Sequence, residues 1–251
     1  MKIEFCKERF AFLAERSFVE EKNDIGIGTL GEKLLHKTVK IFIESSAECR
    51  EKRAFGFVAD ICNENGIFEV QTRSFDRLKP KIEKCLGNIP ITVVYPLVSE
   101  KRILWLNSDS GEIEEIKKSP RPDRPCDALA ELSKIGDYIG KEGFSVILIF
   151  VSADELRILD GWDKTRKKRA TKLNIHPCEL KSIIEIKDKS DLSLLIPEGL
   201  PPRFEAKDFY KKIRRGGRGA FYALKLMTEC GIFRETGKRQ NAKIYEISKK
   251  E

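Results

Sequence analysis

The chain has 251 residues, 41% apolar and 35% charged, which is enough for one or two domains with an ample core. Charged residues interrupt the first twenty positions, and no apolar run reaches the roughly 18 residues of a membrane helix, so neither a signal peptide nor a transmembrane segment is expected. The seven cysteines are odd in number and include no Cys-x-x-Cys pair. They support neither a disulfide framework nor a zinc site, and a reducing cytoplasm is the simplest compartment.

The first predicted element is a helix over residues 31–42. Apolar residues recur at helical spacing along 34–41, with a threonine as the weakest member. Three polar residues fall at i, i+4 and i+8, on one line of this helix: Glu32, His36 and Lys40. An ordinary exposed helix face would show the same pattern.

A β-hairpin is predicted next. Two apolar, β-rich runs at 57–62 and 67–72 flank Asn65-Gly66, and an Asn-Gly pair in this setting is the strongest short-range hairpin signal.

This hairpin gathers polar side chains on one face. Glu69 and Gln71 share a face, because side chains alternate along a strand. A two-residue loop places Asp60 across from Gln71, whereas a four-residue loop places it across from Glu69, and both registers put it on that same face. Two carboxylates on a rigid face can share a divalent cation. The alternative interpretation is a solvated polar face of the sheet.

Two further elements complete this part of the chain. Residues 73–86 read as a basic amphipathic helix, and 91–97 is a continuous apolar run that suits a buried central strand. The order helix, hairpin, helix, strand favours an α/β fold in which a mixed sheet is flanked by helices.

The pattern Asp-x8-Glu-x-Gln formed by Asp60, Glu69 and Gln71 resembles the active site of the PD-(D/E)xK, or restriction-endonuclease-like, nucleases. The usual ending in that superfamily is Glu-x-Lys, and Glu-x-Gln is a variant of it. The resemblance covers residues 25–98 and implies Mg2+ or Mn2+ as the cofactor.

The same resemblance implies roles for individual residues. The metal ligands that it implies are Asp60, Glu69, Glu32 and the backbone carbonyl of Val70. His36 and Lys40 extend the helix line toward the site, as candidates for proton transfer or electrostatic stabilisation. Gln71 stands where a lysine commonly sits; it cannot carry a positive charge or act as a general base, but its amide could orient the attacking water.

The middle of the chain is predicted to extend the nuclease sheet to residue 198. Strands are expected at 102–106, 145–151 and 156–159, with a helix from Asp127 to Ile139 that Asp127 could cap.

Two features of this middle region have competing interpretations. The basic segment 162–172 is either a solvated loop or a loop that follows a phosphate backbone. His176 and Cys178 are expected to belong to a loop and the core rather than to a chemical site.

The excess positive charge lies at the C-terminal end. Residues 199–251 contain 14 Lys and Arg against 6 Asp and Glu, a net charge of +8, and the whole chain, with 48 against 40, is also +8. Residues 1–198 are therefore neutral overall. This distribution is typical of a separate module that binds a polyanion.

The pattern of this C-terminal module is specific. A helix at 206–213, a turn, a helix at 218–230 with Phe221 among its apolar residues, and a β-hairpin at 232–247 resemble a winged helix. That resemblance implies that the second helix enters the major groove and the hairpin grips the flanking backbone. A winged helix used for protein contacts is the alternative. The candidate DNA-binding residues are Arg214, Arg215, Arg218, Lys225, Lys238, Arg239 and Lys243.

Together these features predict a metal-dependent DNA endonuclease of restriction type, and no residue decides whether it belongs to a modification-dependent subtype. The expected domains are a nuclease-like domain at 1–198 and a DNA-binding domain at 199–251. Cutting both strands of a duplex favours a homodimer. Two alternatives stay open. A degenerate nuclease fold could serve as a DNA-binding transcriptional regulator, or the chain could be a repair or competence nuclease that acts on single-stranded DNA.

Overall fold

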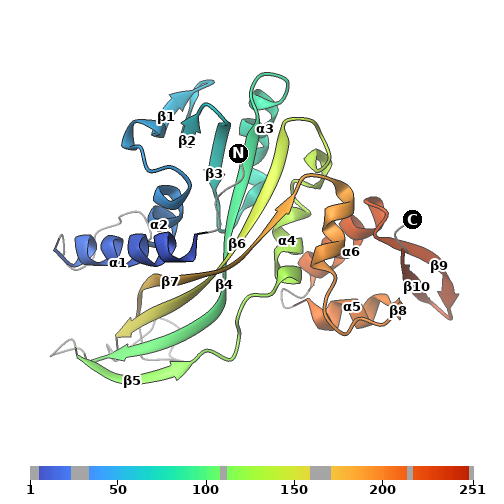
Figure 1. The fold of residues 1–251 in the computed structure, drawn as a ribbon. Helices are drawn as coiled ribbons and strands as arrows, with labels where there is room; N and C mark the ends of the chain where they lie inside the picture. The colour runs from blue at the N-terminus through green and yellow to red at the C-terminus, as the bar shows by residue number, and fades with distance from the viewer. Residues whose placement is uncertain (1–5, 24–33, 108–111, 159–170, 214–216, 249–251) are drawn as a thin grey trace.

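A computed structural model describes residues 6–23, 34–107, 112–158, 171–213 and 217–248. Within these ranges a seven-stranded mixed sheet runs through the molecule in the order β1-β2-β3-β4-β6-β7, with β5 paired to β4 (Figure 1). The strands are β1 (Arg50–Ala54), β2 (Phe57–Asn63), β3 (Gly66–Val70), β4 (Ile91–Leu106), β5 (Ile113–Lys118), β6 (Phe144–Ile158) and β7 (Thr171–Ile186).

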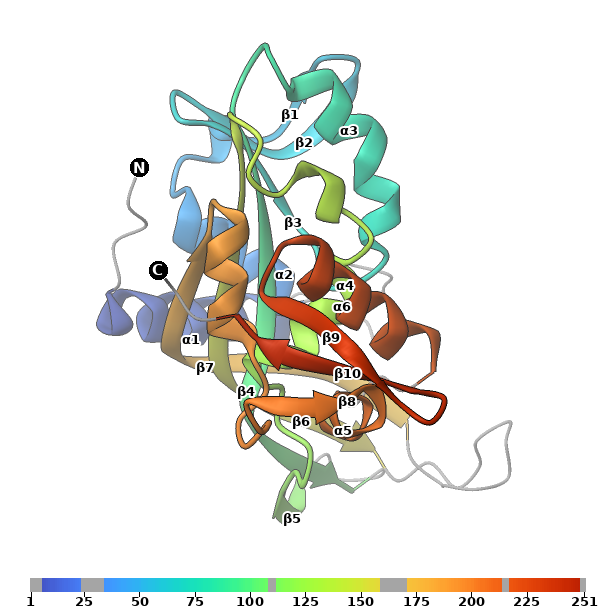
Figure 2. The ribbon, with the colours of Figure 1, turned by 90° about the vertical axis from the view of Figure 1, so that its right-hand side faces the viewer.

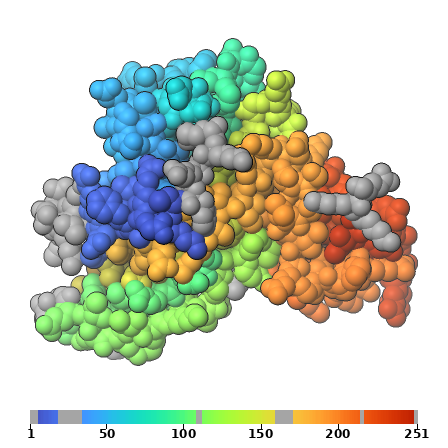
Figure 3. All heavy atoms as spheres, viewed as in Figure 1, coloured from blue at the N-terminus to red at the C-terminus, as the bar shows by residue number. Residues whose placement is uncertain are grey.

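The parallel strands β3, β4 and β6 form the centre of the sheet. The first eight residues of β4 are all buried, as expected for the predicted apolar strand at 91–97. This strand then continues to Leu106, and β6 is one strand over residues 144–158 where two strands were expected, at 145–151 and 156–159; residue 159 lies outside the described residues. The C-terminal halves of β4 and β6, the N-terminal half of β7, and β5 project together as a ribbon on one side of the molecule (Figures 1 and 3). The middle region therefore extends the same sheet.

Helices cover both faces of the sheet. On one face, α1 (Lys7–Asn23) and α2 (Leu34–Ile43) pack over a cluster that includes Val39, Val94 and Leu180. On the other face lie α3 (Lys79–Cys85) and α4 (Leu129–Leu132), together with the 3-10 turns η2 (Phe75–Leu78), η3 (Pro125–Ala128), η4 (Gly136–Tyr138) and η5 (Lys189–Leu195). A further 3-10 turn, η1 (Ala47–Cys49), lies beside β1 and β2. The predicted fold class, a mixed α/β sheet flanked by helices, is confirmed.

The hairpin of β2 and β3 adopts a register in which Ile61 pairs with Phe68 and Asn63 pairs with Gly66. Continued by one residue, this register sets Asp60 opposite Glu69, the pairing that was expected with a four-residue loop. The loop itself has only two residues, Glu64 and Asn65, because Asn63 already pairs with Gly66. Gly66 has φ +120°, and a Cβ there would lie 2.3 Å from the carbonyl oxygen of Pro90. Only glycine fits this position, because both the backbone angle and the space exclude a side chain.

Three expectations for local structure were wrong. The single helix from Asp127 to Ile139 is divided into η3, α4 and η4, and Ile135 between them leaves helical geometry at φ −121°. Asp127 does not begin a long helix; its carboxylate accepts a hydrogen bond from the Arg124 backbone N–H, three residues earlier, at 2.9 Å. His176 and Cys178 lie on strand β7 rather than in a loop.

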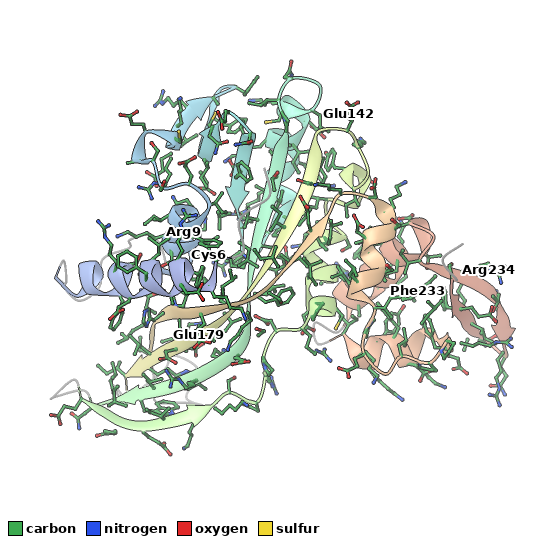
Figure 4. The ribbon with its side chains drawn as sticks, viewed as in Figure 1. Cys6, Arg9, Glu142, Glu179, Phe233 and Arg234 are labelled. Carbon is green, nitrogen blue, oxygen red and sulfur yellow. The ribbon has the colours of Figure 1, made fainter. Side chains whose placement is uncertain are left out.

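The C-terminal unit contains β8 (Arg203–Glu205), α5 (Ala206–Lys212), α6 (Arg218–Glu229), β9 (Phe233–Arg239) and β10 (Ala242–Ile247). Its sheet has the order β8-β10-β9 and lies with α6 in front of the large sheet in Figure 2. The order helix, turn, helix, hairpin follows the expectation, and β8 is an additional strand. Phe233, the first residue of β9, is buried, whereas Arg234 and the rest of the strand are exposed (Figure 4).

This unit packs against α4 and η4 and shares their apolar core. Leu226 of α6 approaches Gly136 so closely that a Cβ on this glycine would lie 2.6 Å from its Cδ1. Phe221 was expected among the apolar residues of the helix, but its side chain is 54% exposed. The face of α6 that packs inward carries Ala223, Leu226 and Met227 instead.

Candidate metal and active site

Asp60 is the centre of a charged cluster at the end of the hairpin. Its Oδ2 accepts a hydrogen bond from the backbone N–H of Val70 at 2.9 Å and lies 3.5 Å from Nε2 of His36. Its Oδ1 lies 3.8 Å from Nζ of Lys40. The carboxylate is therefore fixed by one backbone donor and by two side chains of α2.

Helix α2 aims His36 and Lys40 at this point because the two residues are one turn apart on its polar line. The apolar positions of the helix are buried against the sheet, which fixes the direction of that line. Nε2 of His36 donates a hydrogen bond of 2.5 Å to the carbonyl oxygen of Val70. Lys40 is 4% exposed, and its Nζ also lies 2.9 Å from Oε1 of Glu51. A hollow of about 270 Å3 beside this cluster is lined by Lys37, Lys40, Ile41, Ala47, Arg50 and Glu51.

Glu69 is the second carboxylate of the cluster and is only 3% exposed. Its Oε2 accepts a hydrogen bond of 2.7 Å from Nζ of Lys81, which comes from α3. The same Nζ donates to the carbonyl oxygen of Val58 at 2.9 Å, so the lysine is held in place. Oε1 of Glu69 is buried and has no hydrogen-bond partner among the residues that the structure describes.

The two carboxyl groups have pKa values that are shifted in opposite directions. Burial raises the pKa of Glu69, and the nearby negative charge of Asp60 raises it further, against the opposing effect of Lys81. Burial also acts to raise the pKa of Asp60, but His36, the Val70 N–H and Lys40 together bring it below its usual value. A pair of neighbouring carboxyls with divergent pKa values is a typical property of catalytic sites.

This arrangement fits a hard divalent cation. A buried carboxylate oxygen without a partner is energetically costly, and a cation coordinated by oxygen would offset that cost. Glu69 supplies this oxygen, and Asp60 supplies a second carboxylate. The carbonyl of Val70 belongs to the residue whose N–H donates to Asp60, and it accepts a hydrogen bond from His36. The residues that could hold the ion are therefore Asp60, Glu69 and Val70.

Not all of the predicted site residues come together. Gln71 turns away, because its Nε2 donates a hydrogen bond of 2.6 Å to the carbonyl oxygen of Arg73 in the following loop. The role predicted for this amide, orienting the attacking water, stays a prediction. Glu32 lies outside the described residues.

Lys81 is the residue that sequence reasoning missed. The sequence predicted a basic helix around it but gave no sign of which lysine would reach the hairpin. Its contact with Glu69 depends on how α3 packs back on the sheet, with Ile82 and Cys85 buried. The only signal in the sequence is its position immediately before Ile82, at the border of the buried side of the helix.

The candidate DNA-binding residues lie on the surface of the C-terminal unit. Arg218, Lys238 and Arg239 are exposed. Lys225 lies 3.5 Å from Glu229, and Lys243 lies 2.8 Å from Glu235, so both have acidic neighbours. Arg214 and Arg215 are outside the described residues, as is the basic segment up to residue 170.

Comparison with known proteins places this geometry in a family. Residues 33–187, more than half of the chain, match the family described as Domain of unknown function (DUF8091). The chain belongs to this family. The matched region runs from the start of α2 to the end of β7, so it contains Asp60, Glu69 and Lys81 and ends before the C-terminal unit.

A relative in Treponema pallidum (strain Nichols), an uncharacterized protein, is 26% identical over 222 residues, which cover 87% of this chain and 86% of that protein. No solved structure matches the chain. No helix in the described ranges is long and apolar enough to cross a membrane.

Proposed function

We propose that this DUF8091 protein is a metal-dependent DNA endonuclease of restriction type. The observation that carries the proposal is the buried Oε1 of Glu69, which has no partner within the described residues and lies close to a second carboxylate whose charge acts on it. The PD-(D/E)xK resemblance of the hairpin points to the same chemistry. The organisation around one mixed sheet is compatible with it.

In this proposal Asp60, Glu69 and the carbonyl of Val70 would hold Mg2+ or Mn2+. Such an ion supplies Lewis-acid stabilisation of a phosphodiester and lowers the pKa of a bound water. His36 holds the Val70 carbonyl and Asp60 in a fixed relation. Lys40 presents its charge to Asp60 beside the basic hollow, where it can offset negative charge on a phosphate.

Lys81 would provide the positive charge that Gln71 lacks. Its ammonium group lies 2.7 Å from Glu69, so it is placed to stabilise charge that develops on the phosphodiester during hydrolysis. The motif's missing lysine would thus be replaced by one from α3.

The C-terminal unit would supply the affinity for duplex DNA. We propose that it acts as a winged helix: the exposed side of α6 carries Arg218, Phe221, Tyr222 and Lys225, and the tip of the β9–β10 hairpin carries Lys238 and Arg239. Basic side chains of this kind bind the phosphate backbone. We also propose that the protein is a homodimer in the cytoplasm, where its seven free cysteines would stay reduced.

A second candidate function is supported by Gln71. Because its amide is engaged with Arg73, the motif's third position contributes nothing to the carboxylates. The nuclease fold would then be catalytically degenerate, and the chain would act as a DNA-binding transcriptional regulator.

One experiment separates these two functions. The protein is incubated with supercoiled plasmid, methylated and unmethylated, and with single-stranded DNA, in the presence of Mg2+, Mn2+ or a chelator. An endonuclease nicks or linearises the plasmid only with metal, and Asp60→Asn and Glu69→Gln abolish cleavage. Asp76→Asn, which changes an exposed aspartate, leaves cleavage intact.

Metal-independent binding to duplex DNA without any cleavage would favour the regulator. Cleavage of single strands alone would instead favour a repair or competence nuclease.

A further inference from the structure

A second cluster of possible metal ligands lies where β6 pairs with β7. Strands β3 and β4 separate this pair from β2, which carries Asp60. Asp154, His176 and Cys178 each offer one ligand atom, and these atoms all lie within 4.8 Å of one another. They form a mixed oxygen, nitrogen and sulfur set. This combination differs from the oxygen ligands of the hairpin site.

A β-bulge assembles the cluster. Asp154 pairs directly with His176, and Ala153 pairs with Pro177, but Ser152 pairs with Glu179, so Cys178 is an extra residue in β7. Pro177 has no backbone N–H to donate to the ladder, which suits a bulge. Bulges of this type re-aim side chains, and this one leaves His176 and Cys178 beside the same aspartate.

Asp154 is 8% exposed and is already positioned by Arg102 of β4. Nε of Arg102 donates to Oδ1 at 2.7 Å, and its NH2 group donates to Oδ2 at 2.6 Å. A carboxylate can accept about four hydrogen bonds, so two lone-pair directions remain for a cation. A carboxylate ligand that is itself held by an outer donor is the arrangement found around protein metal centres.

His176 is fixed by helix α1. Its ring stacks on Phe18 with centroids 4.2 Å apart and an interplanar angle of 19°, and its Nε2 lies 3.3 Å from the carbonyl oxygen of Ala14. A carbonyl oxygen only accepts hydrogen bonds, so the neutral ring carries its proton on Nε2 and keeps a lone pair on Nδ1. Donation of one ring N–H to a backbone carbonyl is typical of histidines that bind metal through the other nitrogen.

The same three residue types could form a nucleophilic triad, but the thiol argues against it. Burial, with the neighbouring Asp154 charge, raises the pKa of Cys178 to about 11. Nucleophilic cysteines have a lowered pKa, because the thiolate is the reactive species. The Sγ of Cys178 lies 3.6 Å from the carbonyl oxygen of His176.

We propose that Asp154, His176 and Cys178 bind one Zn2+-like divalent cation, through one carboxylate oxygen, Nδ1 and Sγ, with a fourth position open to water. Zn2+ accepts these three ligand types in tetrahedral sites. The ion would join β6 to the bulged part of β7 beneath α1, close to the position at which Glu179, the residue after Cys178, is labelled in Figure 4. Binding releases the thiol proton of Cys178.

The test uses the full-length protein after chelator treatment. Co2+, which replaces Zn2+ and reports its ligands, is added while absorption is recorded, and Zn2+ affinity is measured by calorimetry. We expect one equivalent of Co2+ with a thiolate-to-cobalt absorption band. Cys178→Ser should remove the band and weaken Zn2+ binding by about 100-fold or more. Loss of a residue that only supports a metal ligand weakens metal affinity by about 10-fold to 100-fold, and loss of a ligand should cost at least the upper value.

The matched control is Cys230→Ser, which changes another half-buried free cysteine in the C-terminal unit and should keep both signals. His176→Gln is the second variant and should weaken Zn2+ binding in the same way. A wild-type protein that shows no thiolate band would overturn the proposal without any variant. A band that survives in Cys178→Ser would also overturn it.

Discussion

Nζ of Lys81 lies 2.7 Å from Oε2 of Glu69, so a lysine of α3 is paired with the carboxylate that follows the hairpin turn. The sequence motif has Gln71 at the position where this charge is usually provided. The two residues reach the hairpin from different directions: Gln71 follows β3 directly, and Lys81 returns to it from the next helix.

The first prediction concerns Lys81. Lys81→Ala should lower the rate of metal-dependent cleavage by roughly 100-fold to 1000-fold, the range for loss of one preorganised electrostatic group. Lys81→Arg should retain part of the activity, because it keeps the charge. Single-turnover kinetics on a plasmid checks this, with Lys84→Ala, an exposed lysine of the same helix, as the control. Equal rates for Lys81→Ala and Lys84→Ala would show that Lys81 has no electrostatic role.

Gln71 gives the complementary prediction. Its amide bonds to Arg73, so Gln71→Ala should leave the cleavage rate within about threefold of wild type and lower the free energy of unfolding by about 1 kcal/mol, the net value of one hydrogen bond. Denaturant unfolding and the plasmid assay measure the two quantities. A loss of activity as large as that of Lys81→Ala would mean that the amide turns toward the carboxylates during the reaction.

The pKa of Glu69 predicts how metal binding depends on pH. Burial and the Asp60 charge raise this pKa, so protons compete with the cation at a higher pH than they would at a free glutamate. Mn2+ affinity, measured by calorimetry, should therefore weaken as the pH falls, and the weakening should begin above the ordinary glutamate range of about 4.3. In Glu69→Gln the remaining affinity should lose this dependence. An affinity that is constant over the whole range would contradict the assignment of Glu69 as a ligand.

The parts of the site that were predictable from sequence are those encoded by local patterns. The alternation of 57–72 and the Asn-Gly signal fix the hairpin, and the helical spacing of 34–41 places His36 and Lys40 on one line. His36 and Lys40 then reach Asp60 because the apolar face of α2 is buried against the sheet, which turns the polar line of the helix toward the hairpin. Periodicity was sufficient for these residues.

Contacts between distant segments were not predictable. Lys81 is one of several lysines on α3, and only the packing of this helix selects it. Strand β1 has the sequence Arg-Glu-Lys-Arg-Ala and no buried residue, so no apolar pattern marks it. Likewise, the cluster at His176 and Cys178 depends on a bulge against Asp154, more than twenty positions earlier in the chain.

The hairpin of β9 and β10 gives a prediction for DNA binding. Lys238 and Arg239 are exposed at its tip, so the double variant Lys238→Gln/Arg239→Gln should reduce duplex affinity and its dependence on salt. Each phosphate contact contributes about 0.9 to the slope of log K against log salt concentration, so the slope should fall by roughly 1.8. Fluorescence anisotropy at several salt concentrations measures it. The control double variant Lys141→Gln/Lys187→Gln removes two exposed charges elsewhere, and an equal fall there would show that net charge alone matters.

Glu155 predicts the acid stability of the projecting ribbon. It is 1% exposed, and its carboxylate bonds to Lys101 and Arg157 and lies 3.0 Å from Nζ of Lys172. Burial acts to raise the pKa of this group, but these cations lower it to about 2.

Because the folded pKa lies below the usual value of 4.5, the ionised group stabilises the fold at neutral pH, and this contribution is lost as the pH falls from about 4.5 toward about 2. The shift corresponds to at most about 3 kcal/mol of unfolding free energy. Glu155→Gln should therefore be less stable than wild type at neutral pH by up to this amount, and the difference should shrink toward pH 2. Denaturant unfolding across this range measures it, with the exposed Glu142→Gln as the control. A difference between wild type and Glu155→Gln that stays constant with pH would mean that the lost contact is one of packing and not of charge.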